Sequence, residues 1–163
     1  MSRRLTAKRI AIIVANEFED IELLYPLLRL SEEGASIVLV PVQGGSHPRP
    51  YFEGKPVTGR YGHTVPMRIM KEGVRYSLRS IEELNISDID CLLFPAGFSP
   101  DILRRSERIL ELVREGRRTT GFVAVKDDLT NAGAKFVDAP AVRDGNIKPR
   151  AFQMIFPSSA RRS

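Results

Sequence analysis

Short apolar runs and helical spacings follow one another along the first part of this chain. Residues 10–15 form an unbroken apolar run rich in β-branched side chains, which is typical of a parallel strand buried on both faces. After an acidic turn at 16–20, residues 21–33 show the apolar spacing of a helix. Residues 35–42 then predict a second strand, so that the three segments predict a right-handed β-α-β crossover.

The expected first helix has recognisable ends. Asp20 is a residue type that caps helix starts, and Gly34 suits the left-handed position that follows a helix end. The apolar side chains that give this helix its spacing are Ile21, Leu24, Tyr25 and Leu28, with polar Glu22 and Arg29 between them.

The middle of the chain predicts an antiparallel excursion from short extended pieces at 56–58 and 64–67. A capping-box sequence at 80–84 predicts a short helix. Residues 91–95 predict another buried strand, with a loop at 96–100 that begins at its carboxyl end.

Residues 101–114 predict an amphipathic helix with four inward side chains, Ile102, Ile109, Leu110 and Val113. Strands are expected at 119–125, 135–138 and 141–147, and a short helix at 127–133. The alternation predicts an α/β fold in one domain over 1–163, with loose termini at 1–7 and 148–163.

Composition narrows the class of protein. With 42% hydrophobic residues, the 163-residue chain can supply a core, and its single cysteine excludes an intramolecular disulfide and fits a reducing compartment. The run at 10–15 is shorter than the ~7–15 residues of a signal-peptide core, and no segment reaches the ~20 apolar residues of a membrane span. We therefore expect a cytoplasmic protein without a membrane segment.

The net charge of +5 does not by itself indicate a nucleic-acid partner. Four of the basic residues lie at the chain ends, and elsewhere basic and acidic residues alternate, as at 104–108. Nucleic-acid binding needs a basic stripe with aromatic or base-reading side chains, and residues 116–118 offer only Phe122 nearby. We keep nucleic-acid association as a minor alternative.

Candidate chemistry lies after the first strand. Ligands of open α/β sheets bind beyond the carboxyl ends of the strands, where Glu17, Glu19 and Glu22 are expected. The helix dipole also favours carboxylates at a helix start, which is the simpler explanation for some of them.

Four sequence blocks, at 15–26, 94–101, 125–133 and 142–146, resemble the ThiJ/PfpI superfamily in its PfpI-like intracellular protease branch. The resemblance implies a flavodoxin-like three-layer sandwich and a homo-oligomer, either a dimer or a hexamer. It also implies cysteine-dependent peptidase, glyoxalase or deglycase activity on a peptide or small aldehyde, without a cofactor.

The same resemblance implies roles for individual residues. Glu22 matches the glutamate that hydrogen-bonds the family's catalytic cysteine, and Asp101 matches an acidic residue contributed across the oligomer interface. The backbone of Ala96 and Gly97 matches the family's oxyanion donors. Possible pocket-edge residues are Glu19, Lys126 and Asp127, although the last two also suit a helix cap.

The chain departs from the family at the nucleophile, because it has no Cys-His pair. Gly116 passes directly to Arg117, where about twenty family positions, the length of a strand and a helix, are missing. Covalent catalysis needs an activated nucleophile beside its base, so the family mechanism is predicted to be inactive. The alternative is a non-catalytic oligomeric or small-molecule-binding relative.

The remaining reactive residues do not restore the mechanism. Cys91 lies among large apolar residues and is expected to be a buried core thiol, while His47 and His63 are expected at the surface. Two separated histidines do not predict a metal site. The missing unit would leave a position beside the Cys91 strand, which we expect residues 119–125 or an oligomer partner to cover.

Overall fold

The computed structural model describes residues 4–43, 55–67, 74–114, 118–119, 130 and 135–136. Two compact units can be distinguished, Met1–Ile109 and Leu110–Ser163, and each is described by itself. The predicted single domain over 1–163 stays a prediction. Residues 148–163 lie outside the described residues.

The first unit is built on a parallel sheet with the strand order β5-β2-β1-β6. Its strands are β1 (Arg9–Val14), β2 (Ser36–Pro41), β5 (Tyr76–Leu78) and β6 (Cys91–Leu93). The predicted crossover is confirmed, because helix α1 (Asp20–Glu32) joins β1 to β2, which pair in parallel. Residues 11–14 of β1 are fully buried, as an unbroken apolar run predicts for a central strand.

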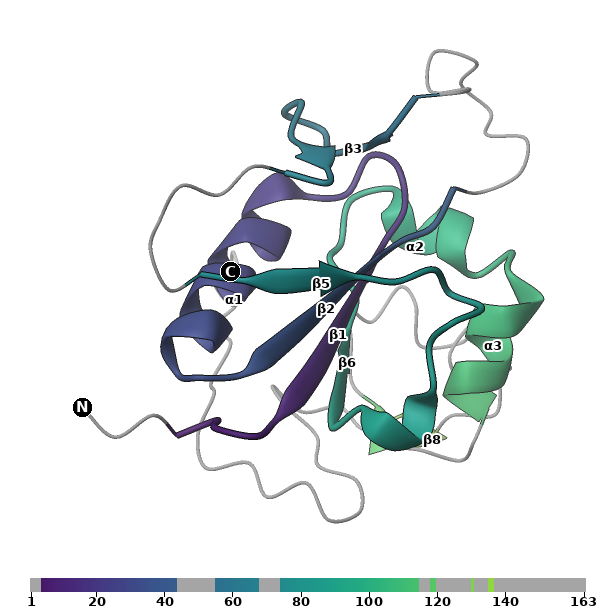
Figure 1. Ribbon diagram of the computed structural model, residues 1–163. Coiled ribbons are helices and arrows are strands. Elements are labelled where there is room, and N and C mark those ends of the chain that lie inside the picture. Colours follow the sequence, from purple (N-terminus) through teal and green to yellow (C-terminus); the bar gives the residue numbers. More distant parts are fainter. Residues whose placement is uncertain are drawn as a thin grey trace, which may run out of the picture. The chain divides into compact units, whose positions relative to one another are not determined.

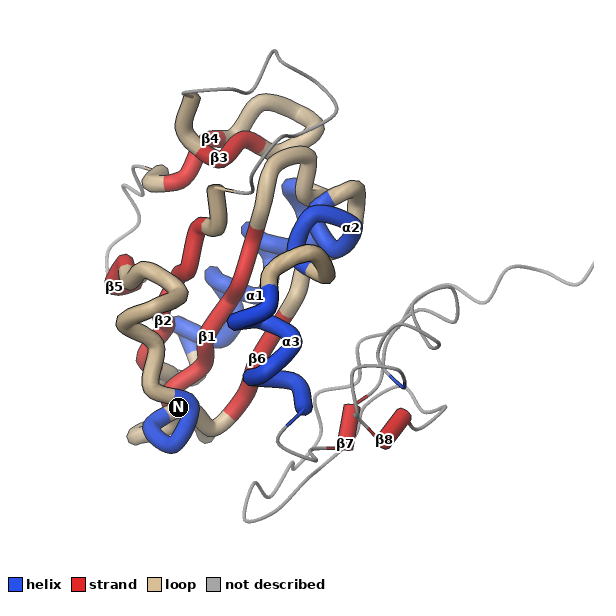
Figure 2. The backbone as a smooth tube through the Cα atoms, turned by 90° about the vertical axis from the view of Figure 1, so that its right-hand side faces the viewer, coloured by secondary structure: helices blue, strands red, loops and turns tan. Residues whose placement is uncertain are grey.

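Helices lie on both sides of this sheet, with α1 on one face and α2 (Ser99–Leu103) on the other (Figures 1 and 2). Side chains alternate between the faces of a strand. Ile10, Ile12 and Val14 belong to the same core cluster as the α1 residues Leu23 and Leu27. The predicted three-layer α/β arrangement is therefore present in this unit.

The apolar residues that marked α1 in the sequence are not the ones that it buries most deeply. The buried leucines are Leu23, Leu27 and Leu30, whereas Ile21 is 63% exposed and Tyr25 is 53% exposed. Apolar residues occupy two sides of this helix, so that spacing alone is compatible with either side facing the sheet.

Of the two ends predicted for α1, the glycine stop is observed and the Asp20 cap is not. The Asp20 cap is wrong, since Glu19 occupies the cap position and makes no side-chain cap bond. At the other end, Gly34 adopts φ of 91° and donates to Ser31 O, while Ala35 N donates to Leu30 O. These two bonds form a Schellman motif, which confirms the predicted glycine stop.

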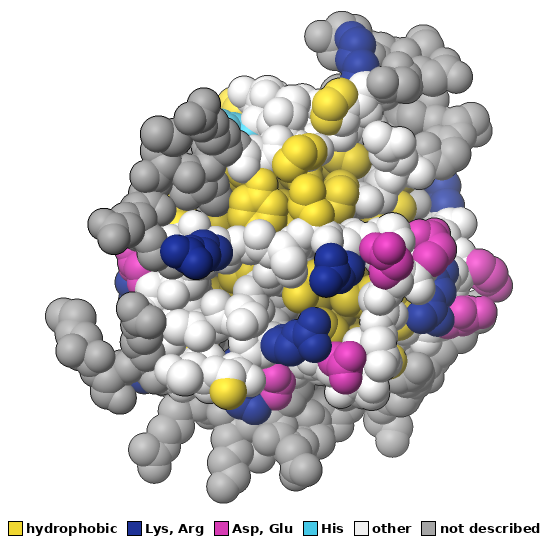
Figure 3. Space-filling model, in the orientation of Figure 1, with side chains coloured by type: hydrophobic (Ala, Val, Ile, Leu, Met, Phe, Trp, Pro, Cys, Tyr) yellow, Lys and Arg dark blue, Asp and Glu magenta, His cyan; other side chains and the backbone are white. Residues whose placement is uncertain are grey.

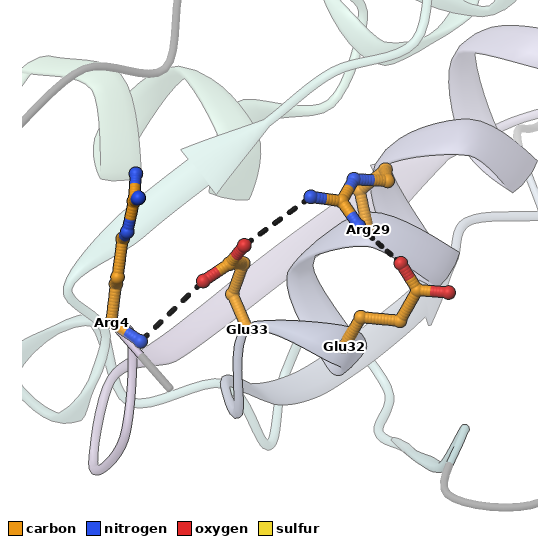
Figure 4. A network of polar contacts seen from close by, with 4 residues as sticks. All are labelled: Arg4, Arg29, Glu32 and Glu33. Atoms are coloured by element: carbon orange, nitrogen blue, oxygen red, sulfur yellow. Dashed lines mark hydrogen bonds and ion pairs between the residues drawn. The ribbon is translucent and has the colours of Figure 1, made fainter. Parts of the chain in front are cut away.

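A polar network closes the same end of α1 (Figure 4). Arg29 pairs with Glu32 and, at 3.2 Å, with Glu33. Glu33 also accepts from the backbone N–H of Arg4 at 3.5 Å, and its own carbonyl accepts from Leu5 N at 2.9 Å. Residues 4 and 5 are thereby attached to the helix end, within the stretch 1–7 that was expected to be loose.

The antiparallel excursion is confirmed as β3 (Val57–Thr58) paired with β4 (Thr64–Val65). The capping-box bonds between Ser80 and Glu83 are also present. The helix predicted there is wrong, because residues 80–84 make a single turn before the 3-10 helix η2 (Ile86–Asp88).

The single helix predicted over 101–114 is two helices, α2 and α3 (Glu107–Arg114). Arg105 N donates to Ile102 O and Ser106 N to Leu103 O, and these tight i→i−3 bonds end α2. Ile102 and Ile109 are buried as predicted, Leu110 and Val113 are half-buried, and buried Leu103 and Leu112 were missed.

In the second unit, β7 (Arg118–Thr119) pairs in parallel with β8 (Lys135–Phe136). The other elements predicted beyond residue 119 lie outside the described residues, apart from Thr130 in a helical conformation. Among the described strands, β6 pairs with β1 and β7 pairs with β8. Coverage of the β6 edge by 119–125 or by an oligomer partner therefore stays a prediction.

None of the helices in the described residues combines the length and apolarity that crossing a bilayer requires.

The observed inner face of α1 can be tested by paired alanine substitutions. We expect Leu27→Ala, at a fully buried side chain, to lower the free energy of unfolding by about 2–5 kcal/mol. Ile21→Ala, at an exposed position, should change it by about 0.5 kcal/mol or less. Urea denaturation measures both, and a larger loss for Ile21→Ala would contradict the observed face.

Candidate functional site

The candidate site lies where two loops meet at the carboxyl ends of β1 and β6. Phe98 N donates to Glu17 O at 2.9 Å, Glu19 N donates to Ala96 O at 3.0 Å, and Phe18 and Gly97 form an isolated antiparallel bridge. These bonds hold the acidic turn after β1 against the loop after β6. The sequence-based expectation that both loops share this edge is confirmed.

Gly97 permits this close approach. It adopts φ of 84°, and a Cβ placed on it would lie 2.3 Å from Glu17 O. A real Cβ atom does not approach a backbone oxygen that closely, so any larger residue would force the two loops apart. Glycine at this position is therefore required by packing as well as by its backbone conformation.

The turn after β1 is also bound to the hairpin β3–β4. Glu17 adopts a left-handed φ of 59°, and its N–H donates to Thr58 O at 2.7 Å. The side chain of Asn16 accepts from Thr58 N at 2.9 Å. Two separate segments, the loop after β6 and the hairpin, thus fix the backbone of the acidic turn.

Glu22 and Ala96 are brought together at this edge, whereas the resemblance implied a contact between Glu22 and a cysteine. Glu22 Oε2 accepts a hydrogen bond of 2.8 Å from Ala96 N, and the Glu22 side chain is half-buried. The carboxylate therefore occupies the backbone donor that was expected to stabilise an oxyanion. A ligand oxygen would have to displace Glu22 from this N–H.

Asp20 was expected to cap α1, but its carboxylate instead binds the loop between β3 and β4. Its buried side chain accepts from Tyr61 N at 2.9 Å, from His63 N at 3.1 Å and contacts His63 Nδ1 at 2.6 Å. Burial acts to raise the pKa of Asp20, but the bonds from Tyr61 and His63 outweigh it and leave the pKa below its ordinary value.

The tight turn at Gly59 explains how Asp20 reaches this loop. A Cβ on Gly59 would lie 2.4 Å from Asp20 Oδ2, so the glycine leaves room for the carboxylate. The sequence did indicate a turn here, because Gly59 and Gly62 flank two exposed residues. The partner of that turn could not be read from spacing.

The other expected site carboxylates have basic partners. Glu19 Oε2 lies 3.1 Å from Arg60 Nη1 on the hairpin loop. Asp101 pairs with Arg104 and, at 2.8 Å, with Arg105 on its own side of the fold. Partial burial acts to raise the pKa of Asp101. The guanidinium groups of Arg104 and Arg105 lower it by more, so the pKa of Asp101 is below its ordinary value. Lys126 and Asp127 lie outside the described residues.

The predicted buried position of Cys91 is wrong, because Cys91 is exposed. It is the first residue of β6 and is level with Ile10 at the start of β1, whereas Ala96 follows the carboxyl end of β6. Desolvation by neighbouring groups and the Asp90 carboxylate raise the pKa of the Cys91 thiol. The thiol is thus at the opposite end of the strand from Glu22 and is disfavoured as a thiolate.

Neither histidine adjoins Cys91 in the sequence, and no contact of the described residues joins His63 to the Cys91 thiol. His63 is at the surface as predicted, although one ring nitrogen contacts buried Asp20. His47 lies outside the described residues. Within the described ranges, no group of three His, Cys, Asp or Glu side chains could hold a metal ion.

Basic and acidic side chains are interspersed on the surface, as they are along the sequence. On the face drawn in Figure 3, the described Lys and Arg side chains lie among Asp and Glu side chains. The expectation that this protein does not bind nucleic acid stays a prediction.

The role of Asp20 can be tested through pH. Because its pKa in the folded protein is lowered, its stabilising contribution is complete above its unfolded pKa of about 3.9 and disappears as pH falls through the folded value. We expect Asp20→Asn to cost about 1–3 kcal/mol of unfolding free energy near pH 7, and progressively less below about pH 4.

The matched control for that measurement is Asp88→Asn, at an exposed carboxylate that lies 3.8 Å from Arg9. It should change the unfolding free energy little at any pH. A deficit of Asp20→Asn that stays the same from pH 7 to pH 3 would contradict the assigned role.

Comparison with known proteins agrees with the architecture. Residues 8–116 match the DJ-1/PfpI family, and the matched range ends at the junction where Gly116 passes to Arg117. The chain is 28% identical to deglycase PfpI of Pyrococcus furiosus, over 85% of this chain and 86% of that protein. It is 31% identical to the putative cysteine protease YraA of Bacillus subtilis, over 86% of this chain and 87% of that protein.

Solved structures show the same fold. A two-domain protein of Anabaena variabilis, with DJ-1/ThiJ/PfpI-like and ferritin-like domains, has a TM-score of 0.53 and 23% identity over 85% of this chain and 42% of its own. A ThiJ/PfpI family protein of Pseudomonas syringae has a TM-score of 0.53 and 18% identity over 88% of this chain and 62% of its own. The predicted flavodoxin-like α/β fold is confirmed, and the chain belongs to the DJ-1/PfpI family.

Proposed function

We propose that this family member does not carry out cysteine-dependent hydrolysis, and that it is a non-catalytic relative which binds a small ligand at the carboxyl edge of its sheet. The observation that carries the proposal is the position of Cys91, the single cysteine of the chain. Cys91 begins β6 and is exposed, while the Glu22–Ala96 contact follows the other end of that strand.

The distance between Cys91 and Ala96 is too long for the Cys91 thiol to act at the Glu22–Ala96 contact. Cys91 and Ala96 are five positions apart along a largely extended segment, which corresponds to roughly 16 Å at ~3.3 Å per residue. A nucleophile and its base act within hydrogen-bond reach, about 2.6–3.2 Å. The raised pKa of the thiol also lowers the fraction of reactive thiolate near neutral pH.

The arrangement of Glu22 supports the same proposal. A preorganised donor accelerates a reaction when it is aimed at charge that develops in the transition state. Here the Ala96 N–H is already paired with a carboxylate at 2.8 Å. Stabilising an oxyanion at this N–H would first require the loss of that bond.

Binding of a peptide or a small aldehyde fits the groups that remain. The edge presents the carboxylates of Glu19 and Glu22 beside the loop 96–98, whose Ala96 N–H and C=O and Phe98 N–H are already bonded within the fold. Such groups recognise polar ligands through hydrogen bonds without forming a covalent bond. The single cysteine supports a cytoplasmic setting as part of this proposal.

The second candidate function is an enzymatic activity kept from the family, and the similarity to named enzymes favours it. The aligned relatives named deglycase or putative cysteine protease share 28–31% identity over about 85% of this chain. Peptidase, glyoxalase or deglycase turnover by this protein would then need a route that does not use a Cys-His pair.

The two candidates can be separated by measuring turnover of methylglyoxal and of a fluorogenic peptide. Both the wild-type chain and Cys91→Ser are assayed. We expect both proteins to give the rate of the buffer blank, because the thiol is outside the site. Amide resonances of Ala96 and Gly97 in the same samples should shift on addition of the peptide.

Turnover that the wild type shows and Cys91→Ser lacks would overturn the loss of cysteine chemistry. Turnover that both proteins retain would establish a different enzyme mechanism. If neither amide resonance moves at millimolar peptide, ligand binding at this edge is wrong.

A further inference from the structure

An exposed histidine on the hairpin lies against a buried carboxylate. His63 directly precedes β4, and its ring nitrogen Nδ1 lies 2.6 Å from Asp20 Oδ1. The His63 side chain is 50% exposed, whereas the Asp20 side chain is 4% exposed. One nitrogen of the ring therefore contacts the buried acid while the ring as a whole still reaches solvent.

The state of Asp20 determines which ring nitrogen of His63 carries the proton. Burial acts to raise the pKa of Asp20, but the hydrogen bonds from Tyr61 and His63 hold it below its ordinary value, so the carboxylate is ionised near neutral pH. An ionised carboxylate only accepts hydrogen bonds, and Nδ1 must therefore be the donor. In the neutral ring the free lone pair is then on Nε2.

The ring contact is not needed to anchor the hairpin loop. Asp20 also accepts from Tyr61 N at 2.9 Å and from His63 N at 3.1 Å, and Gly59 N closes the turn by donating to His63 O at 2.8 Å. These backbone bonds attach the loop between β3 and β4 to the start of α1 (Figure 1) whichever side chain stands at position 63. The imidazole contact adds a fixed tautomer and a fixed ring orientation, which is what a carboxylate provides to functional histidines.

A neutral imidazole nitrogen is a nucleophile near neutral pH, and His63 is the only histidine among the described residues. The thiol of Cys91 is a poorer candidate, because desolvation and the Asp90 carboxylate raise its pKa and the thiolate is the reactive form. Lysine side chains ordinarily lose their proton only near pH 10. The position of Nε2 thus gives the hairpin a reactive group that the ligand site at the sheet edge does not use.

We propose that His63 Nε2 is a phosphorylation site that accepts the phosphoryl group of a small acyl phosphate. The lone pair of Nε2 forms the N–P bond, and the P–O bond to the acyl group breaks, so that the carboxylate of the donor leaves with that electron pair. The proton on Nδ1 stays in place, and the product ring is a cation. Asp20 stabilises this cation, as a buried carboxylate does for the imidazolium of a catalytic triad.

The loop that carries His63 also carries a donor for phosphoryl oxygens. Arg60 lies three residues before His63 in the same turn, and its side chain is 54% exposed. Its Nη1 lies 3.1 Å from Glu19 Oε2, and a guanidinium has five N–H groups in all. Arginine binds phosphate oxygens through paired hydrogen bonds, so Arg60 can neutralise part of the added negative charge. The inference does not depend on the proposed function.

Incubation of the full chain with acetyl phosphate at pH 8 tests the proposal. This pH favours the neutral form of imidazole side chains and preserves the acid-labile N–P bond. Intact mass and phosphorus NMR count the phosphoryl groups bound. We expect one on the wild type and none on His63→Gln. The matched control is His47→Gln, at the chain's other histidine, which should bind one as the wild type does.

Asp20→Asn tests the contribution of the carboxylate. It should slow phosphorylation at least about tenfold, because a neutral amide does not stabilise the cationic ring as a carboxylate does. Circular dichroism checks that both Asp20→Asn and His63→Gln fold. Nitrogen NMR of the wild type reports the tautomer of His63 without any substitution, and we expect the proton on Nδ1.

A wild type that takes up no phosphoryl group would overturn the proposal, as would equal uptake by His63→Gln or loss of uptake in His47→Gln. A folded Asp20→Asn variant that reacts as fast as the wild type would show that the carboxylate does not activate His63, and would also overturn it. If Asp20→Asn does not fold, the wild-type tautomer decides, because a neutral His63 ring with its proton on Nε2 would have no lone pair to react.

Discussion

The candidate site depends on the pairing of two loops, one after β1 and one after β6. Two backbone hydrogen bonds, Phe98 N to Glu17 O and Glu19 N to Ala96 O, hold them in antiparallel contact across Phe18 and Gly97. This contact fixes where α1 begins, because Asp20 follows Glu19 directly. The position of each carboxylate at this edge therefore follows from how closely Gly97 approaches the backbone of Glu17.

The edge retains the acidic groups of a family site but not the thiol. Glu22 is bound to the Ala96 N–H, Glu19 to Arg60, and Asp20 to the hairpin loop. Each of these three carboxylates thus has a donor within the described fold. The exposed thiol of Cys91 is at the other end of β6, which separates the reactive sulfur from all three acids.

Sequence patterns predicted the elements whose physical cause is local. The unbroken apolar run of β1, the glycine stop at Gly34 and the pairing of β3 with β4 were predicted, because burial and turn chemistry leave local marks. The inner face of α1 was not, since Leu23 and Ile21 are chemically equivalent and tertiary packing chooses between them. Asp20 looked like a helix cap, and its actual partners are forty residues away on the hairpin. Cys91 was expected in the core because its sequence neighbours are apolar, and an apolar run does not reveal which of its residues is exposed at the start of a strand.

Comparing Gly97→Ala with Gly62→Ala tests the central importance of this loop contact most directly. Both glycines have positive φ, but a Cβ on Gly62 meets no atom within 4 Å, whereas a Cβ on Gly97 meets Glu17 O at 2.3 Å. Urea denaturation should show a loss of about 1–2 kcal/mol for Gly62→Ala, from the left-handed backbone. The loss for Gly97→Ala should be larger by at least about 2 kcal/mol, because the loops must also separate. Equal losses for the two variants would contradict the account.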